Sequence, residues 1–142
     1  MAGTLRVELV SPERVVFSGD ATMVILRTAE GGDIAFQPGH APFLGALVER
    51  AGQIHLVEGG VVHVAIHGGF VEVSHDTVSI LSDGAELAEM IDADRARHAL
   101  EAAQNRQGHE TDADVNAAIR RATARLNAVA NLPTGMSTSR SH

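Results

Sequence analysis

The sequence predicts a protein of the β-plus-α class, with an N-terminal β-sandwich of short strands and a C-terminal two-helix hairpin. Turn signals recur through the first part of the chain, and the hydrophobic period becomes helical near Asp92. The balance of charge changes at the same place. Residues 1–91 carry four Arg and twelve acidic residues, whereas residues 92–142 carry seven Arg and six acidic residues. We therefore assign residues 1–90 to the sandwich, 91–131 to the hairpin and 132–142 to a disordered tail.

Short segments rich in β-branched residues predict the strands of the sandwich. In chain order they are "LRVELV", "RVVF", "TMVILRT", "DIAFQ", "APFLGALV", "QIHLVE", "VVHVAIH", "FVEVS" and "TVSIL". Pairs of turn-forming residues separate them, among which Gly68-Gly69 is expected to reverse the chain. Alternation within a segment predicts which side chains face inward, as for Val71 and Val73 against Glu72.

The helical hairpin is predicted from two apolar stripes. The first stripe runs from Ala93 through Ala96 and Leu100 to Ala103, after Asp92 as an N-cap. A second helix is expected to start at Thr111. Its stripe consists of Val115, Ile119, Ala122, Leu126 and Val129, and Pro133 ends it. Because alanine buries little apolar surface, this hairpin should dock weakly on the sandwich.

Composition excludes several classes of function. The chain has no Lys, Cys, Trp or Tyr, so it lacks a phosphate-loop lysine, a Schiff-base lysine and thiol chemistry. A net charge of −7 and only four Phe argue against binding nucleic acid. No apolar run is long enough to span a membrane, and no secretory signal is recognisable.

Two enzymatic or metal-binding interpretations find little support. His63 and His67 share one face of a strand, but about 13 Å separates positions four residues apart, so no metal site is expected. A small hydrolase built from Ser11 or Ser18 with His40 would lack the sequence around its nucleophile that such enzymes need. No catalytic residue is therefore assigned.

The segments "LVSPERVVFSGDA", "GGDIAFQPGHAPFLGAL", "GGFVEVSHDTVSILSDGAE" and "IDADRA" together resemble the epsilon subunit of the F-type ATP synthase over residues 5–100. The hairpin fits more loosely, through "IRRATARL". The resemblance implies an antiparallel β-sandwich of about ten short strands followed by two helices. It also implies a non-catalytic subunit of the central rotor stalk that needs no cofactor. Its partners would be the gamma subunit and the membrane rotor ring, with the alpha/beta catalytic head reached when the hairpin extends and blocks ATP hydrolysis. It implies a peripheral location on the cytoplasmic side of the plasma membrane, or of an equivalent energy-coupling membrane, with membrane contact only through the complex.

The resemblance also implies site residues. In some members an Ile/Leu-Asp-x-x-Arg-Ala sequence belongs to a site for ATP as a regulatory ligand, and Ile91, Asp92 and Arg95 match it, with Ala102 in place of a further basic residue. Glu86 matches an acidic member of that site, and Arg121 and Arg125 match two arginines. The alternative is that Asp92 and Arg95 serve only as a helix cap and its pair.

Two further matters remain open from the sequence. The resemblance brings Asp33 and His40 near the rotor ring, while the simpler interpretation of His40 is a turn-stabilising hydrogen bond to backbone. A free-standing ATP-sensing module without a rotor partner is the alternative to the synthase subunit as a whole.

Overall fold

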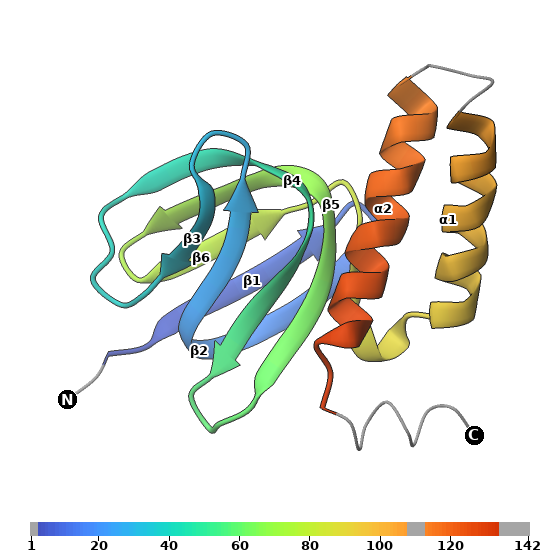
Figure 1. The fold of residues 1–142 in the computed structure, drawn as a ribbon. Coiled ribbons are helices and arrows are strands. Elements are labelled where there is room, and N and C mark those ends of the chain that lie inside the picture. The colour runs from blue at the N-terminus through green and yellow to red at the C-terminus, as the bar shows by residue number, and fades with distance from the viewer. Residues whose placement is uncertain (1–2, 108–112, 134–142) are drawn as a thin grey trace.

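The computed structural model describes residues 3–107 and 113–133. A seven-stranded sheet is followed by a short 3₁₀ helix and two α-helices (Figure 1). Their bounds are β1 (Leu5–Ser11), β2 (Arg14–Thr28), β3 (Gly32–Phe36), β4 (Phe43–Leu56), β5 (Val61–Ser74), β6 (Thr77–Leu81), β7 (Ala85–Leu87), η1 (Ala88–Met90), α1 (Ala93–Gln107) and α2 (Ala113–Ala130). The predicted N-cap at Thr111 and most of the predicted tail lie outside the described residues.

The sheet closes on itself. The strand order is β1-β6-β5-β4-β2-β3, and β1 also pairs with β2, while β7 adds to β5. All pairings are antiparallel except that of β1 with β6, which is parallel. This one parallel pair departs from the purely antiparallel sandwich of the prediction, and it is possible because a long stretch of chain separates the two strands.

The strands are fewer and longer than predicted. β2, β4 and β5 have 15, 14 and 14 residues, and each joins two of the predicted segments. Gly68 and Gly69 lie inside β5 with φ of 81° and 111° and do not reverse the chain there. A long bent strand can serve both layers of a sandwich, so the β-plus-α class is confirmed although the strand count differs.

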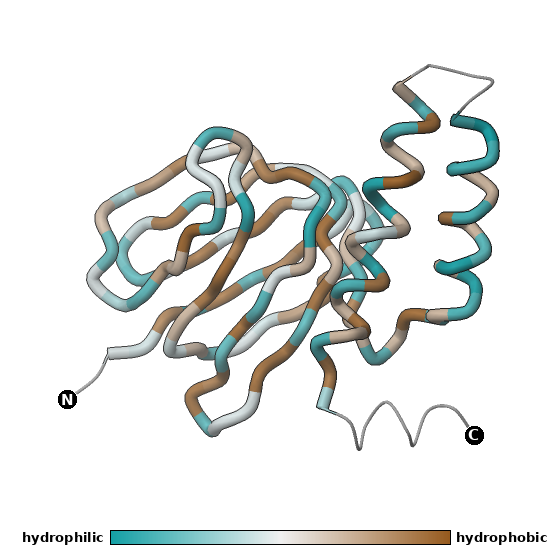
Figure 2. The backbone as a smooth tube through the Cα atoms, viewed as in Figure 1, coloured by the Kyte–Doolittle hydropathy of each residue, from teal (hydrophilic) through white to brown (hydrophobic). Residues whose placement is uncertain are grey.

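The sandwich core consists of side chains from the inward-facing positions of every long strand. Phe36, Leu9, Ile54 and Val71 are among the fully buried members, and Figure 2 shows the alternation of apolar and polar residues along the strands. Val73 is buried beside Val71 whereas Glu72 is exposed, as the alternation predicted. The core of the sandwich is thus complete without the helices.

The hairpin lies against one side of the sandwich, with α2 between the sheet and α1 (Figure 1). α2 contacts β4, β5 and η1, while α1 packs on α2. Asp92 accepts a hydrogen bond from the backbone N–H of Arg95, at 3.1 Å, and so caps α1 as predicted. No helix within residues 3–107 and 113–133 is long and apolar enough to cross a membrane.

Candidate functional site at the hairpin–sandwich interface

The contact between hairpin and sandwich is made largely of small side chains. Ala65 on β5 and Ala88 on η1 are fully buried, and they pack in one cluster with Ala124 and Ala128 of α2. Ile91 and Leu132 complete this cluster. Because four of the six buried members are alanines, the apolar contact stabilises docking only modestly.

Glu86 is the charged centre of this interface. Its Oε2 accepts a hydrogen bond from Nε2 of His67, at 2.9 Å, and another from Nε of Arg125, at 2.6 Å. β7 supplies the carboxylate, β5 the imidazole and α2 the guanidinium, because the register of β5 and β7 pairs Ala65 with Glu86. One oxygen atom therefore ties the hairpin to two strands of the sandwich.

These contacts hold Glu86 ionised. The hydrogen bond from His67 has the largest effect and the one from Arg125 adds to it, so that the pKa of Glu86 is lowered to about 2 although burial acts in the opposite direction. A second pair joins Arg120 of α2 to Glu49 of β4, at 3.0 Å. Burial raises the pKa of Glu49, but a backbone hydrogen bond and the contact with Arg120 lower it below its ordinary value.

Substituting Glu86→Gln should weaken docking of the hairpin by about 1.5 kcal/mol, because the charge that binds Arg125 is lost. This is the low end of the range for a hydrogen bond to a charged group, since about a third of the side chains of Glu86 and Arg125 is exposed to solvent. Only the part of the pKa depression of Glu86 that comes from Arg125 belongs to docking, because His67 stays beside the carboxylate when the hairpin leaves. Since the docked pKa is the lower one, this part of the stabilisation is present while the carboxylate is ionised in both states and is lost as the pH falls towards about 2. Limited proteolysis of the hairpin at several pH values measures both effects. Glu72→Gln, on an exposed position of β5, is the matched control, and equal protection in the two variants would contradict the role of Glu86.

A cavity of about 440 Å³ opens between this interface and the start of α1. Five of the six residues that the sequence predicted for nucleotide binding line it: Glu86, Ile91, Asp92, Arg95 and Arg125. Met90, Ala96 and Ala99 complete the lining. The volume falls in the range of small-molecule pockets, roughly 300–1,000 Å³, and the lining combines an apolar wall with two carboxylates and two guanidinium groups.

The sixth predicted residue lies elsewhere. Arg121 is half-buried on α2 but does not line this cavity. Of the two predicted arginines of α2, only Arg125 reaches the cavity, where it is already bonded to Glu86. Sequence reasoning missed His67 as a member of this site. The only sequence feature that could have indicated His67 was its position on one face of a strand, and the hairpin covers that face.

The two residues predicted near a rotor ring have separate surroundings. Asp33 accepts two hydrogen bonds from Arg27, at 2.7 and 3.2 Å, and the first of these lowers the pKa of Asp33. Nδ1 of His40 donates to the carbonyl of Ala41, at 2.7 Å, which is the turn-stabilising role. The imidazole also meets Phe36 edge-on, with ring centroids 5.0 Å apart.

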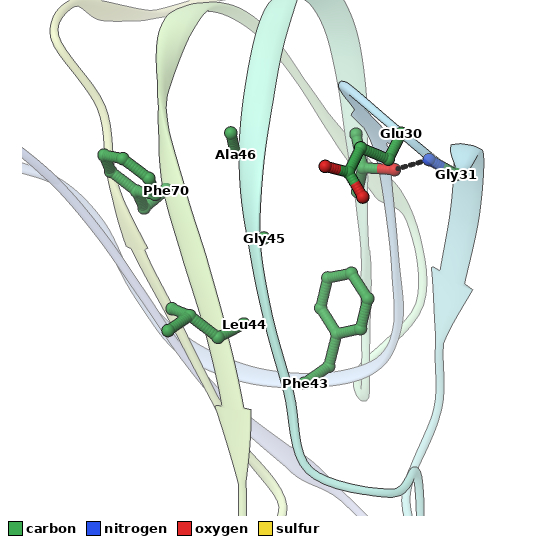
Figure 3. A pocket seen from close by; sticks show the side chains of 8 residues that line it. Glu30, Gly31, Phe43, Leu44, Gly45, Ala46 and Phe70 are labelled. Carbon is green, nitrogen blue, oxygen red and sulfur yellow. Dashed lines mark hydrogen bonds between the residues drawn. The ribbon is translucent and has the colours of Figure 1, made fainter.

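A larger cavity, of about 530 Å³, lies on the sandwich away from the predicted site (Figure 3). Phe43, Leu44 and Phe70 line it together with Glu30. Leu44 and Phe70 are 72% and 58% exposed, which is high for large apolar side chains. Glu30 is the one charged residue among the described residues that line this cavity, and the exposed apolar side chains give the surface the character of a protein contact.

The sandwich defines the class of the protein. The beta-sandwich domain of the ATP synthase delta/epsilon chain matches residues 4–88, which is the whole sandwich. Similar full-length relatives are the ATP synthase epsilon chain of Streptomyces griseus, 49% identical over 92% of this chain and 98% of its own, and that of Thermobifida fusca, 46% identical over 87% and 90%. This chain belongs to the epsilon chains of ATP synthase.

Two solved structures share the fold. One is from the Euglena gracilis mitochondrial ATP synthase, with a TM-score of 0.69 at 20% identity, over 98% of this chain and 82% of that one. The other is from the central stalk and c-ring of the Tetrahymena thermophila mitochondrial ATP synthase, with a TM-score of 0.55 at 19% identity, over 99% and 98%. At these identities they support the fold alone, and they extend it across the hairpin, which the family match does not cover.

Proposed function

We propose that this chain is a non-catalytic subunit of the central rotor stalk, in which the sandwich couples the gamma subunit to the membrane rotor ring and the hairpin regulates ATP hydrolysis. The observation that carries this proposal is the construction of the hairpin interface. It consists of alanine contacts and of ion pairs made by Arg120 and Arg125, so the hairpin can leave while the core of the sandwich remains intact. In the extended state, the same two arginines would be available to carboxylates of the alpha/beta head.

The surface around Leu44 and Phe70 is the proposed contact with the gamma subunit. Both side chains are exposed, and the register of β4 and β5 pairs Ala46 with Phe70, so the apolar area continues across two strands. Contact with the rotor ring through Asp33 and His40 is also proposed. That contact has weaker support, because Arg27 already binds the carboxylate of Asp33.

The location that follows is peripheral, on the cytoplasmic side of the plasma membrane or an equivalent membrane, with contact only through the complex. Affinity purification of the tagged chain from native membranes tests this assembly. Recovery of alpha, beta, gamma and ring subunits supports it. Recovery of the chain alone would support the alternative, a free-standing ATP-sensing module. The similar relatives argue against that alternative, because they are epsilon chains of ATP synthase.

We also propose that ATP occupies the cavity beside Glu86 as a regulatory ligand. Met90, Ile91 and Ala99 would face the base, and Arg95 with the N-terminus of α1 would face the phosphates. Asp92 and Glu86 balance the charge of Arg95 and Arg125, so the cavity has no excess of positive charge. Binding should therefore be weak, and it requires Arg125 to be shared between Glu86 and a phosphate.

Titration calorimetry with ATP should detect binding that Arg95→Ala together with Arg125→Ala abolishes, because the two guanidinium groups of the cavity are then lost. Arg121→Ala is the matched control. It removes the same charge from α2 at a position outside the cavity lining and should leave binding nearly unchanged. Absence of heat at millimolar ATP, or an Arg121→Ala variant as impaired as the double variant, would count against this site.

A further inference from the structure

Two histidines lie on the face of β5 that the hairpin covers. His63, Ala65 and His67 alternate on this face, opposite Gln53, Ala51 and Glu49 of β4. Ala65 is the residue of β5 that packs against Ala124 and Ala128 of α2. The two imidazoles therefore flank the point at which α2 rests on the strand.

Each imidazole has one nitrogen that is buried without a partner. Within residues 3–107 and 113–133, Nδ1 of His63 and Nδ1 of His67 have no hydrogen-bond partner. In the neutral ring this nitrogen can remain an acceptor, but in the imidazolium both nitrogens carry a proton. Protonation would then place a buried donor where nothing accepts it, which disfavours the docked state.

The charges around His67 change when the hairpin leaves. When the hairpin is docked, Arg125 and His67 both bind Oε2 of Glu86. Arg120 forms an ion pair with Glu49, the cross-strand neighbour of His67. Release removes both guanidinium groups and leaves both carboxylates beside the imidazole. Among the described residues, the charged groups beside His67 are Glu49 on β4, Glu86 on β7, and Arg120 and Arg125 on α2. Glu13 in the β1–β2 turn, Arg14 at the start of β2 and Asp83 after β6 line the same pocket as His67.

His63 has fewer charged neighbours than His67, and its protonation should also disfavour the docked state. Burial lowers the pKa of His63, and the charge of His55 on β4 lowers it further. The 3₁₀ helix η1, which packs on β5, carries one acidic residue, Glu89. The part of α2 nearest to Ala65 contributes alanines and no acid. Exposure to water on release would relieve the burial of His63.

We propose that His63 and His67 form a pH-sensitive latch, in which the hairpin docks on neutral imidazoles and is released when they are protonated. A ligand that binds one state more tightly shifts the population towards that state, and the proton is such a ligand here. The latch rests on the proposed ability of the hairpin to leave the sandwich, but it requires neither ATP nor the assembled synthase. A test between pH 8 and pH 6 lies well above the range in which Glu86 takes up a proton.

Single-molecule energy transfer on the full chain tests the latch. The chain has no cysteine, so dyes can be attached through Glu58→Cys, in an exposed turn of the sandwich, and Thr123→Cys, on an exposed position of α2. In buffer without nucleotide, the ratio of docked to released molecules should fall about tenfold between pH 8 and pH 6. The double variant His63→Gln, His67→Gln should lose this response, and His98→Gln, on an exposed position of α1, should keep it.

A distance distribution that is the same at pH 8 and pH 6 in the parent chain overturns the latch, whatever the variants do. A double variant that responds as the parent does overturns it too. If the double variant is already released at pH 8, the two single variants decide, because each should retain a shallower response. A hairpin that is indifferent to pH but still regulates hydrolysis in the synthase would leave the proposed function standing and remove only the latch.

Discussion

A chain carrying Gly69→Ala should be less stable by about 2–6 kcal/mol, the sum of a strained backbone and an overpacked contact. Gly69 has φ of 111°, which side chains other than glycine rarely adopt. A Cβ atom added there would lie 2.6 Å from Cα of Ser82 and closer still to the carbonyl oxygen of Leu81. Both obstacles are backbone atoms at the end of β6, so neither can rotate away.

Thermal unfolding followed by circular dichroism measures this effect, with an expected fall in Tm of about 10 °C or more. Two matched substitutions separate strain from overlap. Gly59→Ala, at φ of 102° with no atom within 4 Å of the added Cβ, should cost about 1–3 kcal/mol from strain alone. Gly84→Ala places its Cβ in ordinary contact, 3.6 Å from His67, and should be nearly neutral. A Gly69→Ala variant as stable as Gly84→Ala would contradict the close approach.

The same glycine marks where the sequence was misinterpreted. Two adjacent glycines between β-type segments predicted a reversal of the chain, but Gly68 and Gly69 instead let β5 continue while β6 approaches it closely. A positive φ and the absence of Cβ serve a turn and a close approach equally well. Local sequence could therefore locate the glycine pair without deciding what it does, and two predicted strands became one.

The hairpin was predicted from its apolar stripe, and the stripe accounted for only part of the buried surface of α2, with Val129 alone of its members packing against the sandwich cluster. Val115 and Ala122 are buried as predicted, but the face that meets the sandwich is carried by Ala124 and Ala128. Alanine barely stands out in a hydrophobic pattern, so the pattern of a helix between two layers shows only one of its buried faces. The change from strand to helix near Asp92 was easier to predict, because a cap residue and a change of period coincide there.

Among the candidate site residues, the local ones were brought together as expected, and of the two distant arginines only Arg125 joined them. Ile91, Asp92 and Arg95 lie within one turn of the start of α1, so their spacing alone places them at a common cavity. The contact between His67 and Glu86 depends on the register of a three-residue strand, β7, which has no recognisable pattern of its own. The rotation of the docked helix about its axis decides which arginine of α2 faces that carboxylate. Tertiary packing sets this rotation, so the residues around each arginine do not reveal it.

Removing residues 92–142 should raise the rate of ATP hydrolysis by the assembled synthase several-fold while leaving the complex intact. The sandwich core closes without the helices, so the truncated chain should keep the surfaces proposed to contact gamma and the ring. What it loses are the alanine face of α2 and the arginines Arg120 and Arg125, which in the docked state bind Glu49 and Glu86. If the extended hairpin is the brake, its removal abolishes inhibition in every rotational position of the motor.

A nested truncation gives the matched control for this experiment. A chain that lacks only residues 134–142 keeps α1, α2 and Leu132, which packs in the interface cluster. The synthase assembled with it should hydrolyse ATP at the parental rate. Charge reversal of both arginines, by Arg120→Glu and Arg125→Glu, should also raise hydrolysis, because they would then repel the carboxylates proposed as their partners on the head. The purified complexes must contain equal amounts of the subunit for the rates to be compared. An unchanged rate in an intact complex without residues 92–142 would show that the hairpin is not the brake.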